Sequence, residues 1–129
     1  MALTSNYSKS KLLKHFTRLG PYLRESLCQD DLFFFDCLAI CVNAKTAPEK
    51  REFWGWWLEL RGELNGFVYH YKLGMFDKAG NWQHIEINKS NIIKSLEDTL
   101  QEFHKRLSDS LNTLELTLTP CPKMVAINL

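Results

Sequence analysis

The stretch REFWGWWLEL, residues 51–60, constrains the fold more than any other part of the chain. It places Phe53, Trp54, Trp56 and Trp57 within five positions, separated only by Gly55, and holds three of the four tryptophans. With a strand's period of two, two tryptophans and two leucines share one face, and a mixed set occupies the other. The apolar face predicts core, and the mixed face is a candidate interface. A bulge at Gly55 would change which aromatic side chains share a face.

Three further segments have the character of β-strands, and short turns connect them. Residues 32–43 (LFFFDCLAICVN) are apolar at both parities, which predicts cover on both faces. Residues 67–76 alternate, and residues 81–87 (NWQHIEI) follow the hairpin signal DKAG. Together the four segments predict an antiparallel meander. Residues 114–118 (LELTL) alternate as well and are a candidate for one more short strand.

Asp36 is the exception in the first strand segment. It lies among three phenylalanines and a leucine, where a carboxylate requires a hydrogen-bond donor or an open strand end. We expect a structural or interface carboxylate rather than a catalytic one.

Helical spacing appears near both ends of the chain. Ser8 or Ser10 can cap a first helix that stops at Gly20-Pro21. A long amphipathic helix starts near Ser90, with too few heptads for a true coiled coil. The sequence therefore predicts an α+β fold, a four-stranded antiparallel meander sheet packed by an N-terminal helix and a long C-terminal amphipathic helix. The apolar stripes are Leu12, Leu13, Phe16 and Leu19, and Ile93, Leu96, Leu100, Phe103, Leu107, Leu111 and Leu114.

Length and composition predict one domain over residues 1–129, with a weakly structured tail from about 120 to 129. No run of apolar residues has the length of a membrane helix, and the N-terminus lacks a signal-peptide pattern. We expect a cytoplasmic protein with free thiols at Cys28, Cys37, Cys41 and Cys121.

Charge is distributed unevenly along the chain. Residues 1–24 contain five bases and no acid, and the remainder has eleven bases against fifteen acids, so the net charge is only +1. A basic N-terminal segment can dock on an acidic surface or on phosphate, and it can equally be a solvated helix face.

Motifs of catalysis are missing from the sequence. The four histidines are scattered, no nucleotide-binding or hydrolase motif occurs, and no Cys/His spacing fits zinc. His104 is expected to be solvated on the polar side of the long helix. We therefore predict no enzyme, no catalytic residue, no metal and no cofactor. An RNA-binding module that stacks bases on an aromatic sheet face is the alternative, although the RRM element order and its RNP1 motif are missing.

Several strings resemble the sigma factor-binding Crl family of enteric bacteria. They are SKSKLLKHFTRLGPYLRE, FFFDCLAICVNAKTAPEKREFWGWW, GMFDKAGNW and LEDTLQEFHKRL, and the resemblance covers about Lys9 to Leu118. It implies a transcription activator that binds the stationary-phase sigma factor, sigma-S. Such a protein helps sigma-S to capture core RNA polymerase without reading DNA itself.

The resemblance also implies which residues contact the sigma factor. The family's binding surface is a shallow groove between loops, and the matching positions here are Tyr22, Arg51, Phe53 and Trp56, with Trp82 as a secondary addition. Phe53 and Trp56 can share this groove only if Gly55 bulges or Phe53 belongs to the preceding loop. Trp54 or Trp57 is then expected in the core. We expect a monomer, with a weak dimer left open.

Overall fold

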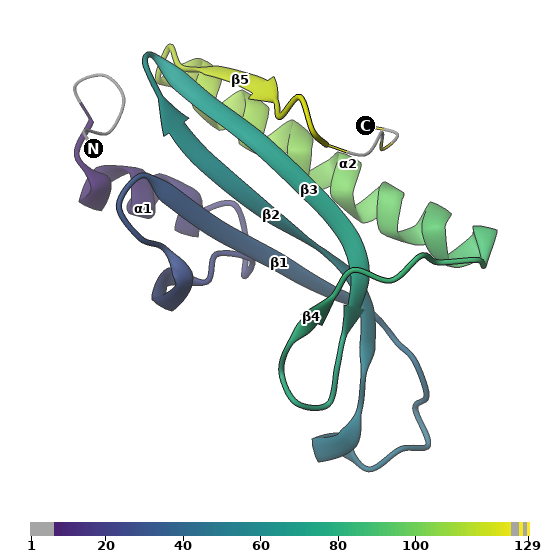
Figure 1. Ribbon diagram of the computed structural model, residues 1–129. Coiled ribbons are helices and arrows are strands. Elements are labelled where there is room, and N and C mark those ends of the chain that lie inside the picture. Colours follow the sequence, from purple (N-terminus) through teal and green to yellow (C-terminus); the bar gives the residue numbers. More distant parts are fainter. Residues whose placement is uncertain (1–6, 125–126, 128) are drawn as a thin grey trace.

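The structure, a computed structural model, describes residues 7–124, 127 and 129. Two α-helices, two short 3-10 helices and five strands follow one another along these residues (Figure 1). Their order is α1 (Lys9–Thr17), η1 (Glu25–Leu27), β1 (Leu32–Cys41), η2 (Pro48–Lys50), β2 (Phe53–Glu63), β3 (Gly66–Phe76), β4 (Trp82–Gln83), α2 (Ser90–Thr113) and β5 (Thr117–Pro120).

The two predicted helices are confirmed. Ser8 caps α1, and its Oγ accepts a hydrogen bond from the Lys11 amide at 3.2 Å. α1 ends at Thr17, before the expected stop at Gly20-Pro21, and the chain continues as a turn. α2 begins at Ser90 as expected, and its apolar stripe is buried from Leu96 onward.

The predicted four-stranded antiparallel meander is wrong in two respects. The sheet is mixed and has five strands: β1, β2, β3 and β4 are antiparallel neighbours, and β5 pairs with β3 in parallel. In addition, the fourth strand segment, predicted over residues 81–87, pairs only at Trp82 and Gln83.

Both differences follow from how α2 is attached to the sheet. After Gln83 the chain leaves the sheet to reach the helix layer, and Ile87 is buried just before α2 begins. After α2 it returns along β3, where Gly66 permits the close approach of β5: a Cβ there would lie 1.9 Å from Thr117 Oγ1. The predicted strand at residues 114–118 is therefore real, although it runs from Thr117 to Pro120. Beyond Pro120, the described residues form no helix or strand.

Both helices cover the same face of the sheet (Figure 1). Phe16 of α1 packs edge-on against Phe33, Phe35 and Phe67, and Phe103 of α2 packs against Phe35. The core lies between this face and the two helices. The opposite face carries no helix of the described chain, and we call it the open face.

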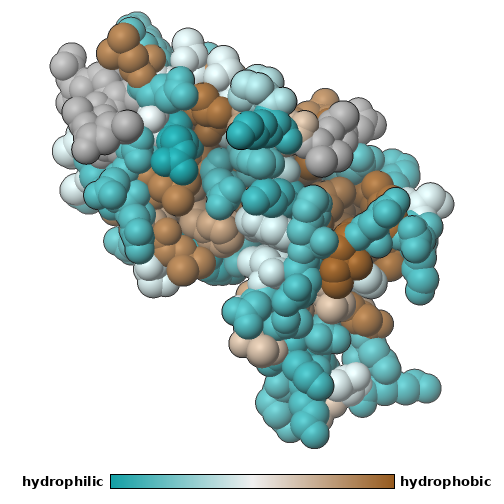
Figure 2. All heavy atoms as spheres, in the orientation of Figure 1, coloured by the Kyte–Doolittle hydropathy of each residue, from teal (hydrophilic) through white to brown (hydrophobic). Residues whose placement is uncertain are grey.

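The far ends of β1 and β2, together with β4, project past both helices (Figure 1). We call this projection, residues 39–54 and 75–83, the distal arm. On the side seen in Figure 2 it is narrow and mostly hydrophilic at its tip. No helix in the described part of the chain is long and apolar enough to cross a membrane.

Candidate functional site

The aromatic stretch lies in β2, and its register decides which way each ring points. β2 pairs with β3 without interruption from Phe53 to Glu63, so the bulge at Gly55, one of the two conditions for Phe53 and Trp56 to share a groove, is absent. The register shift lies on β1 instead, between Leu38 and Ile40. Phe53 is the first residue of β2, three positions before Trp56, and the two side chains therefore point to opposite faces.

Trp56 is in the core. Its side chain is 0% exposed, it packs against Phe103 at 5.0 Å, and its indole N–H donates to Thr99 Oγ1 of α2 at 3.0 Å. The expectation that Trp56 lines an open groove is wrong, because α2 lies over it. Trp57, expected in the core as one of two possibilities, is 7% exposed on the opposite face.

Tyr22 lies at the edge of β1 and covers one side of Trp56. Its ring is 5.7 Å from the Trp56 ring and 5.2 Å from that of Phe103, and it is half-buried. The segment that carries it pairs with β1, since the Tyr22 carbonyl accepts from the Asp36 amide at 2.9 Å and the Arg24 amide donates to the Phe34 carbonyl at 2.8 Å. These backbone bonds fix where the tyrosine is presented. Tyr22 and Trp56 are thus brought together.

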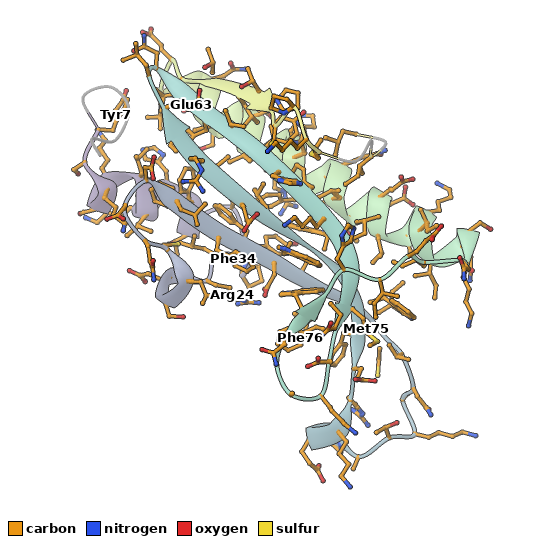
Figure 3. The ribbon with its side chains drawn as sticks, in the orientation of Figure 1. Tyr7, Arg24, Phe34, Glu63, Met75 and Phe76 are labelled. Carbon is orange, nitrogen blue, oxygen red and sulfur yellow. The ribbon has the colours of Figure 1, made fainter. Side chains whose placement is uncertain are left out.

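Asp36 connects three segments on the open face. Its carboxylate accepts from Arg24 Nε at 2.5 Å and from the Trp82 indole N–H at 3.0 Å, and its side chain is buried. The expected donors for this carboxylate are therefore present. Figure 3 shows Arg24 and Phe34 beside β1 on this side of the molecule.

Trp82 provides the cover that Trp57 needs. The two indoles lie 4.8 Å apart, and Phe76 packs against Trp82 at 5.3 Å. The floor of this stack is Gly55, where an added Cβ would lie 2.8 Å from the Trp82 ring. Because Trp57 is covered by Trp82, it offers little ring surface for the base stacking that an RNA-binding module requires.

Arg51 holds the loop of the distal arm in place. Its Nε donates to the Thr46 carbonyl at 2.9 Å, and its Nη2 donates to the Ala44 carbonyl at 3.0 Å. A second contact, from the Lys78 amide to Glu52 Oε2 at 3.2 Å, joins this loop to the turn between β3 and β4. The tip of the arm is therefore organised by its own hydrogen bonds.

Apolar side chains lie on both faces of the arm. Ile40, Trp54 and Met75 are cross-strand neighbours on one face, and Cys41, Phe53 and Phe76 are neighbours on the other. All six are half-buried, and Figure 3 marks Met75 and Phe76 at the root of β4. Arg51 and Phe53 thus belong to the distal arm, whereas Tyr22 and Trp56 lie outside it, in the part of the molecule that α2 covers. Ile40, Trp54 and Met75 were not among the predicted site residues. They are half-buried because the helices end before the arm, and strand periodicity does not reveal where the helices end.

A basic surface lies on α1, away from the arm. Ser10, Lys11, Lys14, His15 and Arg18 line a shallow depression of about 370 Å³.

In the described part of the chain, no group of three or more His, Cys, Asp or Glu side chains is placed to hold a metal ion. Cys28, Cys37, Cys41 and Cys121 are free, and burial raises the pKa of the Cys28 and Cys37 thiols. The geometry offers surfaces for binding a macromolecule.

The comparison with known proteins identifies the family. Residues 1–128 match the family described as "Sigma factor-binding transcriptional regulator Crl". The chain belongs to the Crl family. A sigma factor-binding protein Crl of Vibrio cholerae El Tor N16961 is 40% identical over 118 residues, 91% of each chain. One from Vibrio vulnificus YJ016 is 38% identical over 109 residues, 84% of each chain, and one from Photobacterium profundum is 51% identical over 72 residues, 56% of this chain and 54% of the relative. This Crl family member is therefore a sigma factor-binding regulator of transcription.

Proposed function

We propose that this chain binds sigma-S in the cytoplasm, promotes its assembly with core RNA polymerase and so activates sigma-S-dependent genes. Membership of the Crl family supports sigma-factor binding. The distal arm supports the location, because its half-buried aromatic side chains carry no helix cover and lie beside an arginine. The choice of sigma-S and the polymerase step rest on the family resemblance.

The proposed mechanism is a population shift. A sigma factor that is a weak competitor for core polymerase spends part of its time in conformations that the polymerase cannot capture. A partner that binds the competent conformation more tightly than the others raises the competent fraction by that difference in affinity. This mechanism needs only a binding surface, and no chemical step.

Arg51 has two tasks in this proposal. Two of its nitrogens already hold carbonyls of residues 44 and 46, so a carboxylate of sigma-S would approach the remaining N–H groups at the end of the guanidinium. Replacing it with lysine would lose both the loop contacts and the planar donor set. We therefore expect Arg51→Lys to weaken binding.

The other site residues divide by position. Phe53, close to Arg51 on the arm, would contact sigma-S directly and exclude water around the Arg51 pair. Tyr22 would make a separate contact at the edge of β1. Trp56 would act through Tyr22, which rests on its ring. Trp82 would act by supporting the root of the arm, since it packs on Phe76 and bonds to Asp36.

The basic surface of α1 provides a second contact in this proposal. Its charge suits an acidic region of the polymerase, which would give the protein one surface for sigma-S and another for the core enzyme. Direct binding of nucleic acid is not required, and a monomer suffices.

The decisive experiment is calorimetric titration of the protein into sigma-S, a housekeeping sigma factor and a single-stranded RNA. We expect binding to sigma-S, with Phe53→Ala costing roughly 2–4 kcal/mol, a loss of about 30-fold to several hundredfold in affinity. Leu64→Ala is the matched control, since Leu64 is an apolar side chain, 86% exposed, in the turn between β2 and β3 far from the arm. Arg51→Ala should also lose binding while keeping its circular dichroism spectrum.

Two outcomes would contradict the proposal. A folded Phe53→Ala protein that binds sigma-S like the parent would remove the arm from the site. Salt-sensitive binding to RNA without binding to sigma-S would favour the RNA-binding alternative.

A further inference from the structure

The outer edge of β3 has a gap between its two neighbouring strands. β5 pairs with Gly66–Tyr69, and β4 pairs with Met75–Phe76. Over residues 70–73, no strand of the described chain pairs with this edge. An unpaired edge presents N–H and C=O groups to any extended chain, and proteins usually protect such edges.

The backbone groups in this gap point outward at every second residue. The Tyr69 carbonyl accepts from the Cys121 amide at 2.9 Å, and the Tyr71 amide donates to Met124 Sδ at 3.4 Å. Because strand hydrogen-bonding groups alternate between the two edges, those of Leu73 face outward as well. Within the described residues, the acceptor of the Tyr71 amide is thus a thioether sulfur, and sulfur is a weak acceptor.

A groove of about 520 Å³ lies along this part of the edge. Leu73 of β3 forms one wall, and Ile87 and Ile93, before and within α2, form another. Ile127 also belongs to the lining. Two residues near the C-terminus, Met124 and Ile127, are therefore in contact with or beside the unpaired edge.

Charge gives this edge little protection. Lysine side chains often prevent edge-to-edge pairing, and Lys72 lies in the middle of the gap. However, its Nζ is 3.4 Å from Glu59 Oε1 and 6.0 Å from the centre of the Trp57 ring, so it is engaged across the open face of the sheet. Another element has to cover the edge.

We propose that the C-terminal segment, through Met124 and Ile127, closes one side of this groove and protects the edge of β3 from pairing with a second chain. The Met124 sulfur accepts the hydrogen bond of the Tyr71 amide, and Ile127 forms part of the apolar wall of the groove. The weak sulfur acceptor makes this cover easier to displace than a backbone-paired strand. This role is separate from the proposed binding of sigma-S, because the groove lies at the opposite edge of the sheet from Tyr22.

The first test compares the full chain with a variant that ends at Lys123. Amide hydrogen exchange, resolved by NMR, should become at least about tenfold faster at Tyr71 and Leu73 in the shortened protein. The amides of α2 should keep their protection, which serves as the internal control for the fold. Unchanged exchange at Tyr71 and Leu73 would overturn the proposal.

A matched pair of point variants tests the same idea in the full-length chain. Ile127→Ser and Leu129→Ser make the same change two residues apart, and only Ile127 lines the groove. Leu129 is 40% exposed. We expect faster exchange at Leu73 in Ile127→Ser alone. Equal effects of the two substitutions would show that the groove is not the reason.

A third experiment tests whether the uncovered edge of β3 pairs with other chains. The shortened protein should self-associate with rising concentration in light scattering, and the full chain should not. A synthetic peptide of residues 122–129, PKMVAINL, should bind the shortened protein, restore protection at Leu73 and reverse the association. A scrambled peptide is the control, and a peptide that fails to restore protection would contradict the assignment of this segment to the groove.

Discussion

Gly55 lies where a backbone carbonyl and a tryptophan ring both approach β2 closely. A Cβ added there would be 2.0 Å from the Cys37 carbonyl oxygen and 2.8 Å from the Trp82 ring. The residue has no positive φ and forms no bulge, so glycine is required here for space rather than for backbone conformation. The absence of a side chain lets the Trp57–Trp82 stack lie flat against the sheet.

This argument predicts that Gly55→Ala destabilises the protein by about 2–3 kcal/mol, because the backbone neighbour cannot move as a side-chain tip can. Urea unfolding followed by tryptophan fluorescence measures the change. The double variant Gly55→Ala/Trp82→Ala separates the two contacts. It should not recover the loss of Gly55→Ala, because the carbonyl clash remains; recovery would mean that the indole, and not the backbone, sets the limit.

At the scale of elements, α2 holds a histidine that the sequence placed in solvent. His104 is half-buried: its ring lies 4.9 Å from the Tyr69 ring, and its Nδ1 is 3.0 Å from the Tyr71 hydroxyl. Burial lowers the pKa of His104 and raises the pKa of Tyr71 well above its usual value. With Nδ1 unprotonated, the tyrosine hydroxyl can donate to it, and protonation of the ring would remove that acceptor.

The lowered pKa makes stability depend on pH. Below the unfolded value of about 6.5, the unfolded chain binds a proton that the folded chain resists, so the free energy of unfolding falls as the pH falls through this range. His104→Gln should therefore lose less stability than the parent between pH 7 and pH 5 in urea titrations. Burial also lowers the pKa of His70, on the other face of β3, so His70→Gln is the control for a histidine without a tyrosine partner. Parallel pH profiles for the parent and His104→Gln would contradict this role.

The same elements indicate how far the sequence alone could lead. α1 with its Ser8 cap, the stripe of α2 and the three long strands were predictable, because each depends on residues close together in the chain. β5 was placed only as a candidate, and the shortness of β4 was missed, since both depend on where the chain crosses between layers. The alternation placed Trp56 on the apolar core face, which is confirmed, whereas the family resemblance placed it in an open groove, which is wrong. Trp57 is buried on the opposite face because Trp82, which lies far along the chain, covers it. Periodicity indicates which side chains share a face and which face is apolar, but not which distant residues cover the mixed face.

At the scale of the whole molecule, the basic surface of α1 and the distal arm lie at different ends (Figure 1). The bases of α1 include Lys11 and Lys14, and the first 24 residues contain no acid, although the net charge of the chain is only +1. The positive electrostatic potential is therefore confined to the region of α1. An acidic partner would be attracted to one end of the protein, and salt would screen that attraction within about 10 Å.

This separation predicts that the two proposed contacts can be removed independently. The double variant Lys11→Glu/Lys14→Glu should bind sigma-S like the parent, but weaken capture of the sigma-S complex by core polymerase by about tenfold at low salt, with a smaller loss at high salt. Native gel titration of core enzyme into the preformed complex measures this step. Lys94→Glu/Lys105→Glu is matched in net charge and lies on the exposed side of α2, where both lysines form surface ion pairs of little energetic consequence. If the α2 variant lost as much as the α1 variant, total charge rather than the α1 surface would govern assembly.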